Sequence, residues 1–326
     1  MLTPTSLNSG FGHDSTTSDV LEGIELSRRF AIVTGGYSGL GLAMTHALTD
    51  AGADVLVPAR RPDVARSALR DIPRASTAQL DLADQASIRT FARDVLATGR
   101  PIDILINAAG IMHGPRTLVG PGWEAHFAVN HLGHFTLTTM LLPALATGAR
   151  VVGLSSAGHF LSDIRWHDPH FSRAGEYDQR TAYGQSKTAV ALFALHLDTL
   201  LTPRGAHAFA VHPGSILTPL QREVPLQTQR ELGWIAGESD KPAPGFKTAE
   251  QGAATAIWAA TSPLLEHHGG AYCQDCDIAE PATSDDMLVG GVKPWILDHN
   301  AAARLWRMSA DLTGTDVDRH HRGTGG

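Results

Sequence analysis

A tyrosine and a lysine stand four residues apart, at Tyr183 and Lys187. A helix would bring their side chains together, because positions i and i+4 are neighbours on its surface. A free phenol has a pKa of about 10 and is a poor proton carrier near neutrality. We expect the ammonium group of Lys187 to lower the pKa of Tyr183, which would suit the phenol to general acid and base catalysis.

A glycine-rich segment lies upstream, where residues 34–41 read Thr-Gly-Gly-Tyr-Ser-Gly-Leu-Gly. It follows the short apolar run 30–33 and precedes a helical pattern, which predicts a strand, a turn and a helix in that order. Glycines at 35, 39 and 41 allow a tight turn and let the backbone approach a pyrophosphate at the start of the helix. Taken alone, the segment could also be a structural turn of any parallel α/β protein.

With both motifs present, the chain resembles the short-chain dehydrogenase/reductase family over roughly residues 23–312. The family motifs are T-G-x-x-x-G-x-G and Y-x-x-x-K. Further matches follow in the family's order: Asp81-Leu82, Asn107-Ala108-Ala109-Gly110, Asn130, Ser155-Ser156, His212-Pro213-Gly214 and Thr218. Ala108 departs from the family's usual second asparagine. Residues 127–135 and 275–279 are similar to the branch with retinol-dehydrogenase-like and WW-domain-oxidoreductase-like enzymes.

The resemblance implies a catalytic role for four residues. Tyr183 would exchange a proton with the substrate oxygen, Lys187 would also hold the nicotinamide ribose, and Ser156 would orient the substrate oxygen. Ser156 is preferred over Ser155 because the family's catalytic serine is normally the second of such a pair. Asn130 would hold a water that links Lys187 to solvent. Asparagine is a poor helix former, so its presence in a helical pattern also favours a functional role.

The second predicted strand ends at Ala59-Arg60-Arg61-Pro62, without the acidic residue that would hold a ribose 2′-hydroxyl. Arg60 and Arg61 offer planar donors for a 2′-phosphate, so we expect NADP(H) as the cofactor. Solvated surface arginines are the alternative. The residues expected to contact the cofactor are Gly35, Tyr37, Ser38, Gly39, Leu40, Gly41, Arg60, Arg61, Asp81, Leu82, Asn107, Ala108, Ala109, Gly110, Tyr183, Lys187, Pro213, Gly214, Ile216 and Thr218.

Strand and helix patterns alternate along the chain, which predicts an α/β fold with a doubly wound parallel sheet of the Rossmann type. About seven strands are expected, at 31–34, 55–58, 78–81, 102–106, 150–155, 206–211 and 271–273, with helices on both faces. We expect a flexible tail at 1–22, a single NADP-binding catalytic domain at 23–312 and a disordered tail at 313–326.

Composition excludes several classes of function. A net charge of −7 argues against a nucleic-acid-binding surface. The sequence contains no signal peptide and no apolar run long enough to span a membrane, so a cytoplasmic protein is expected. Two cysteines cannot complete a zinc site, and no carboxylate stands at a matching spacing to His126, His131 and His134, so no metal is expected.

We therefore expect an NADP(H)-dependent oxidoreductase that acts on a lipophilic, uncharged aldehyde or ketone, or on the matching alcohol. The apolar residues of 216–246 suggest that substrate class, since their charged neighbours, which include Glu223, come in pairs of opposite sign. A non-catalytic NADP-binding sensor of the same fold is the alternative, and a sugar-nucleotide epimerase fits the glycine spacing less well. The helix around 188–197 is apolar on almost every side, which predicts a homodimer or homotetramer.

Overall fold

The structure, a computed structural model, describes residues 4–112, 114–222, 224–236 and 241–315. Eight strands form one sheet in the order β10-β9-β8-β7-β4-β1-β2-β3. Their bounds are β1 Phe30–Val33, β2 Asp54–Ala59, β3 Ala75–Gln79, β4 Ile102–Asn107, β7 Leu145–Leu154, β8 His207–His212, β9 Tyr272–Gln274 and β10 Asp277–Ile278. All neighbouring strands run parallel except β9 and β10. The predicted doubly wound parallel sheet is confirmed, with one strand more than expected.

The additional strand β10 arises from a two-residue reversal at Asp275 and Cys276. Both residues have positive φ angles, of 51° and 60°. Two successive left-handed residues make the tight turn whose twist suits an antiparallel hairpin. The sequence lacks the glycine or asparagine that usually marks such a turn, so the strand was not predicted from it.

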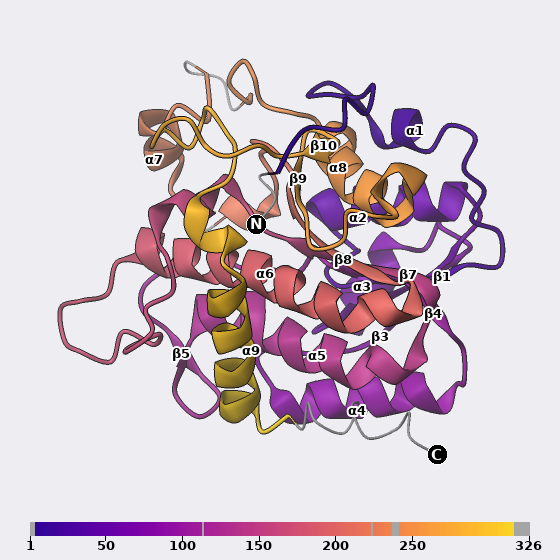
Figure 1. Cartoon of the computed structure of the whole chain (residues 1–326), viewed down its shortest axis with the longest axis horizontal. Coiled ribbons are helices and arrows are strands. Elements are labelled where there is room, and N and C mark those ends of the chain that lie inside the picture. Colours follow the sequence, from indigo (N-terminus) through magenta and orange to yellow (C-terminus); the bar gives the residue numbers. More distant parts are fainter. Residues whose placement is uncertain (1–3, 113, 223, 237–240, 316–326) are drawn as a thin grey trace.

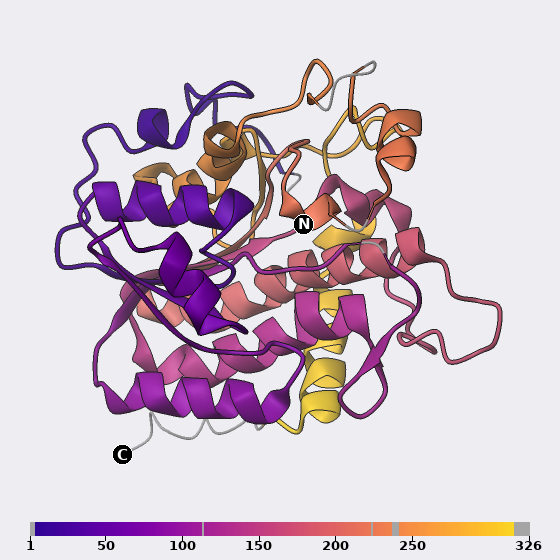
Figure 2. The same ribbon diagram turned by 180° about the vertical axis from the view of Figure 1, so that it is seen from behind.

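Helices cover both faces of the sheet (Figures 1 and 2). One face carries α4 (Gln85–Ala97), α5 (Gly133–Leu141) and α6 (Gln179–Leu201), and the other carries α2 (Gly39–Asp50), α3 (Pro62–Ala68) and α8 (Ala249–Thr261). Alternate residues of β1 divide between the layers: Ile32 packs with the first helix layer, and Ala31 and Val33 pack with the second. The strand is apolar throughout because both of its faces are buried.

A C-terminal helix, α9 (His299–Thr313), lies across the outer side of α6 (Figure 1). Trp306 stacks on Phe193 of α6, with ring centroids 5.7 Å apart and planes at 11°. It also meets Phe135 of α5 edge-on at 4.9 Å. Part of the apolar outer face of α6, on which the expected homo-oligomer was based, is thus covered within the chain.

The described part of the N-terminal segment packs on the rest of the protein. Asp277 accepts hydrogen bonds from the Ser6 hydroxyl and the Leu7 amide, both at 2.7 Å. The short helix α1 (Thr17–Val20) lies against α8, and Val20 is buried. The mobility of residues 1–22 and the single-domain organisation stay predictions, and residues 316–326 of the expected C-terminal tail lie outside the described residues.

Candidate active site

The glycine-rich turn joins β1 to α2 and is closely packed. Gly35 has a φ of +69°, and a Cβ there would lie 3.0 Å from the Cα of Ala109. A Cβ at Gly41 would overlap the carbonyl oxygen of Gly35, and Gly39 also has a positive φ, of +52°. Side chains at these positions would fill the turn, so the backbone presents the open cradle that a pyrophosphate requires at a helix N-terminus.

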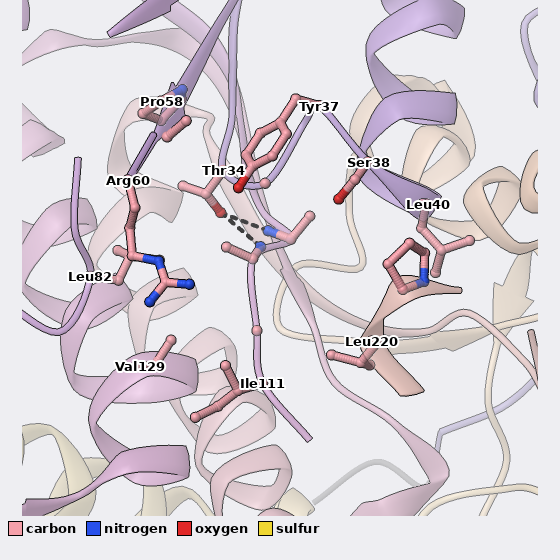
Figure 3. A pocket seen from close by; sticks show the side chains of 18 of the residues that line it. Thr34, Tyr37, Ser38, Leu40, Pro58, Arg60, Leu82, Ile111, Val129 and Leu220 are labelled. Carbon is pink, nitrogen blue, oxygen red and sulfur yellow. Dashed lines mark hydrogen bonds between the residues drawn. The ribbon is translucent and has the colours of Figure 1, made fainter. Parts of the chain in front are cut away.

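A groove of ≈ 210 Å³ opens above this turn (Figure 3). It brings together most of the residues predicted to contact the cofactor: Gly35, Tyr37, Ser38, Gly39, Leu40, Gly41, Arg60, Asp81, Leu82, Ala108, Ala109, Gly110 and Thr218. Residues that were not among the predicted cofactor contacts also line it, namely Thr34, Pro58, Ala59, Leu80, Ile111, Val129, Pro219, Leu220 and Arg222. Most of these residues follow a strand end or adjoin a motif, so only their proximity in sequence to predicted residues could have indicated that they line the groove.

The two arginines after β2 take different places. Arg60 turns its guanidinium group into the groove (Figure 3). Arg61 is exposed at the N-terminus of α3 and does not line the groove. At the end of β3, the carboxylate of Asp81 accepts a hydrogen bond from the Ala83 amide at 2.9 Å. Of the two arginines after β2, Arg60 is therefore the one that a ligand in the groove would meet.

Asn107 lies at the end of β4, but its side chain is buried and directed away from the groove. Its amide nitrogen donates to the Thr138 hydroxyl of α5 at 2.9 Å. Its side-chain oxygen is buried without a hydrogen-bond partner among the described residues. In this structure Asn107 thus ties β4 to α5 and makes no side-chain surface for a ligand.

The segment after β8 contains four of the residues predicted to contact the cofactor: Pro213, Gly214, Ile216 and Thr218. Gly214 has a φ of +92°, and a Cβ there would lie 2.9 Å from the side chain of Lys247. The Lys247 amide donates to the Ser215 carbonyl at 2.9 Å, and its ammonium group lies 2.5 Å from the Asp275 carboxylate. This buried lysine fixes the backbone that carries Gly214. No local pattern indicates this pair, because Lys247 and Asp275 are 28 residues apart in the chain.

Two other predicted residues of the segment after β8 are placed by local contacts. Ile216 is buried against Gly252 of α8, beside Leu40. Thr218 accepts a hydrogen bond from the Leu220 amide and begins the short 3₁₀ helix η5 (Pro219–Gln221). Pro213, Gly214 and Ile216 do not line the groove above the glycine-rich turn, whereas Thr218 does.

Tyr183 and Lys187 share one face of α6, as the spacing predicts. Asp178 caps this helix by accepting from the Thr181 amide at 2.7 Å. The ammonium nitrogen of Lys187 lies 5.5 Å from the centroid of the Tyr183 ring and donates to the Leu154 carbonyl at 2.7 Å. The end of β7 therefore holds the lysine beside the phenol.

The two adjacent serines after β7 face different partners. Ser156 shares a hydrogen bond with the side chain of Tyr183 and accepts from the Gly158 amide at 3.0 Å. Ser155 is buried and donates to the Lys187 carbonyl at 2.8 Å. A Cβ at Gly158 would lie 2.8 Å from the Tyr183 ring, so only glycine allows this close approach. Ser156 is thus the serine that lies beside the phenol.

Burial dominates the electrostatics of the pair. The surrounding protein raises the pKa of Tyr183 to about 12, because loss of water disfavours the phenolate, and the hydrogen bond with Ser156 opposes this effect. Burial lowers the pKa of Lys187 to about 8. The expected lowering of the phenol pKa does not appear in the protein without cofactor, since desolvation outweighs the opposing hydrogen bond with Ser156.

Asn130 lies within a π-helix, η1 (Phe127–Leu132), immediately before α5. Its side-chain amide donates to the Ile111 carbonyl at 3.0 Å and to the Ser186 hydroxyl at 2.9 Å, and its side-chain oxygen accepts from the Ile111 amide. A Cβ at Gly110 would lie 3.2 Å from that oxygen and 3.9 Å from the ammonium nitrogen of Lys187. Asn130 therefore joins the segment after β4 to α6 next to Lys187. π-Helical turns are often found at functional sites.

The three histidines near this helix are engaged separately. His126 bonds Glu124 at 2.7 Å, His131 bonds Ser309 at 2.7 Å, and His134 bonds Thr34 at 2.9 Å. Across the ranges that the structure describes, no group of three or more His, Cys, Asp or Glu side chains is arranged to bind a metal ion.

Comparison with known proteins agrees with this arrangement. Residues 29–166 match the family model for short chain dehydrogenases. A probable oxidoreductase of Streptomyces lividans is 43% identical, over 88% of this chain and 98% of its own length. The chain belongs to the short-chain dehydrogenase/reductase family. Polyprenol dehydrogenase of Mus musculus is 38% identical over 88% of this chain and 84% of its own, and mouse retinol dehydrogenase 12 is 35% identical over 96% and 94%.

Solved structures share the fold. An uncharacterized protein from Mycobacterium paratuberculosis aligns with a TM-score of 0.72 at 30% identity, over 93% of this chain and 99% of its own. Pseudomonas aeruginosa RhlG in an NADP active-site complex aligns with a TM-score of 0.60 at 25% identity, over 77% and 95%. Among the residues described for the present chain, no helix is both long and apolar enough to span a bilayer.

Proposed function

We propose that this protein is an NADP(H)-dependent oxidoreductase that interconverts a lipophilic, uncharged aldehyde or ketone and the matching alcohol. The observation that carries the proposal is the grouping of Tyr183, Ser156 and Lys187 near the end of β7, where Lys187 lies close to Gly110 of the groove above the glycine-rich turn. A phenol that bonds a serine beside a buried ammonium group is suited to proton exchange with a substrate oxygen.

The proposed roles follow from the contacts. Ser156 orients the substrate oxygen toward the Tyr183 hydroxyl, and Tyr183 donates the proton during reduction or accepts it during oxidation. Lys187 favours the phenolate, and Asn130 holds Gly110 close to the ammonium group of Lys187. When bound, the nicotinamide supplies or accepts the hydride. Because burial, partly opposed by the hydrogen bond with Ser156, raises the pKa of Tyr183 to about 12, a change at Lys187 on cofactor binding would have to offset the effect of burial.

NADP(H) is proposed over NAD(H) because Arg60 turns into the groove. At this position NAD-dependent enzymes have an acidic residue that binds the ribose 2′-hydroxyl, whereas an arginine suits a 2′-phosphate. The NADP complex of the Pseudomonas aeruginosa relative supports the same choice. Arg222 also lines this groove and adds a second cation to it.

The substrate class is proposed from the segment that follows β8, which lines the groove at Thr218, Pro219 and Leu220. Leu226 begins α7 (Leu226–Glu231) and Leu232 follows it, with 50% and 45% of their surfaces exposed, while Val224 and Ile235 of the same segment are buried. Glu223, which entered the charge argument, lies outside the described residues. An apolar cover favours lipophilic substrates, at roughly 25 cal/mol per Å² of apolar surface buried. Two relatives are named for apolar alcohols, polyprenol and retinol.

The proposal is tested by incubating the purified protein with NADPH and a panel of aldehydes and ketones, and by following NADPH consumption. Tyr183→Phe should lower turnover by about 10²- to 10⁴-fold while NADPH still binds. Tyr177→Phe is the matched control, because burial also raises the pKa of this neighbouring phenol to about 12. Near-normal turnover in Tyr183→Phe would contradict the mechanism. NADPH binding without turnover of any panel member would favour the non-catalytic sensor.

A further inference from the structure

His134 is a buried residue of α5 that the proposed chemistry does not use. It lies one helical turn after Asn130 and is 3% exposed. Its two ring nitrogens contact two different parts of the site: Nε2 lies 2.9 Å from the Thr34 hydroxyl, and Nδ1 lies 3.1 Å from the Asn130 carbonyl oxygen. Thr34 begins the glycine-rich turn, and Asn130 belongs to the π-helix beside Lys187.

The direction of each hydrogen bond follows from the number of available protons. The Thr34 oxygen accepts from the amides of Ala108 at 2.9 Å and Ala109 at 3.0 Å (Figure 3). A threonine hydroxyl has one proton of its own to donate. His134 Nε2 receives it at 2.9 Å, whereas the other acceptor, the Ile106 carbonyl, is 3.5 Å away. His134 Nε2 is therefore the unprotonated nitrogen of the ring.

The proton of the neutral imidazole must then be on Nδ1, which donates to the Asn130 carbonyl. Burial keeps this ring neutral, because it lowers the pKa of His134 to about 4, with a further lowering by the charge of Lys187. The chain of bonds from Ala108 and Ala109 through Thr34 and His134 to Asn130 consequently has one consistent direction.

This chain of bonds ties together two close contacts of the site. Gly35 in the turn packs against Ala109, where a Cβ would lie 3.0 Å from the Ala109 Cα. At the other end, Gly110 packs against Asn130 and Lys187. His134 is the side chain that reaches both the turn and the π-helix, and it does so next to Ala108, where the family usually has an asparagine. A rigid link at this point would fix the distance between the cofactor cradle and Lys187.

We propose that His134 is a positioning residue that couples the cofactor-binding turn to the catalytic helix through Thr34 and Asn130. The inference rests on the proposed NADP(H)-dependent function. Each half of the coupling has its own readout. The bond to Thr34 governs cofactor affinity, because Thr34 holds the turn against Ala109. The bond to Asn130 governs turnover, because Asn130 and Gly110 set the surroundings of Lys187.

Two substitutions separate the halves, since an asparagine amide takes the place of Nδ1 and a glutamine amide that of Nε2. His134→Asn keeps the hydrogen bond to the Asn130 carbonyl and loses the hydrogen bond to the Thr34 hydroxyl. Its Kd for NADPH should therefore rise on the order of 10-fold, while its kcat stays within about threefold of the wild-type value. His134→Gln keeps the hydrogen bond to the Thr34 hydroxyl and loses the hydrogen bond to the Asn130 carbonyl. Its kcat at saturating NADPH should therefore fall on the order of 10-fold, while its Kd for NADPH stays within about threefold of the wild-type value.

His131→Asn is the matched control. His131 is buried on the same helical segment, but its Nε2 faces Ser309 of α9 at 2.7 Å. This variant should lower the melting temperature and leave the Kd for NADPH and kcat unchanged. Kd is measured by titrating NADPH without substrate, and kcat with the best substrate of the carbonyl panel.

The opposite pattern in the two His134 variants, equal effects on both constants, or no effect would each overturn the proposal. If the wild-type protein binds NADPH and reduces no carbonyl compound, the proposed reaction is wrong. The Kd values for NADPH still test whether the hydrogen bond between His134 and Thr34 governs cofactor affinity. In that case, weaker binding by His134→Asn alone supports the link, and equal Kd values for the two variants overturn it.

Discussion

Replacing Lys187 by methionine should stabilise the cofactor-free protein while it removes activity. Lys187 is 6% exposed, and its ammonium group donates a hydrogen bond to the Leu154 carbonyl at 2.7 Å. Burial lowers its pKa from 10.5 to about 8. At about 1.4 kcal/mol per pKa unit, keeping this side chain charged in the folded state costs roughly 3 kcal/mol. Methionine has a similar stem and no charge.

The net gain is smaller, because the Leu154 carbonyl loses its donor at a cost of about 1 kcal/mol. We expect Lys187→Met to raise the free energy of unfolding at pH 7 by about 2 kcal/mol. For a chain of this length that corresponds to a rise in melting temperature of roughly 3 °C.

The sign of the pH dependence follows from the lowered pKa of Lys187. Below about pH 8 the lysine is protonated in both states, so the folded protein bears the full cost. Between about pH 8 and 10.5 the folded state releases the proton while the unfolded state retains it, and the wild type gains stability with pH. The advantage of Lys187→Met should therefore shrink as pH rises and be close to zero by about pH 10.

Lys247→Met is the matched control, since Lys247 is a second buried lysine but is paired with Asp275 at 2.5 Å. Removing it leaves the half-buried Asp275 carboxylate without its cation, so this variant should lose about 1–3 kcal/mol at pH 7. Thermal unfolding of both variants and the wild type, without cofactor and at several pH values, gives the comparison. A Lys187→Met protein less stable than wild type at pH 7 would refute the reasoning.

Four further predictions concern the cofactor, the substrate, the covering helix and self-association. Arg60→Asp should shift preference from NADP(H) to NAD(H), and equal or better efficiency with NADH in the wild type would contradict the proposed cofactor. Catalytic efficiency should be higher for a long-chain aldehyde or an aromatic ketone than for acetone or a 2-oxo acid, and preference for the 2-oxo acid would exclude an apolar site. Trp306→Ala should cost about 3–5 kcal/mol of unfolding free energy, because it leaves a cavity against Phe193. Light scattering on the wild type and this variant tests self-association, with a homodimer or homotetramer still expected for the wild type, and a 34.6 kDa monomer would refute it.

Local spacing in the sequence was enough to predict the fold class and 13 of the residues that line the groove above the glycine-rich turn. Gly35, Gly39 and Gly41 occupy positions where the backbone has positive φ or no room for a Cβ, and such requirements are visible in residue type. Tyr183 and Lys187 share a face of α6 because helical periodicity alone places i and i+4 together. The alternation of apolar strands and helical patterns likewise predicted the parallel sheet, except for β10.

The tertiary structure decided what depends on partners distant in the chain. The pKa of Tyr183 is raised because surrounding protein excludes water, which a nearby lysine in the sequence cannot reveal. Asn107 turns to Thr138, 31 residues away, and Lys247 pairs with Asp275 over 28 residues. The link from His134 to Thr34 spans 100 residues. Periodicity and residue type report on neighbours along the chain, whereas these contacts arise only when α5, α6 and the strand ends pack together.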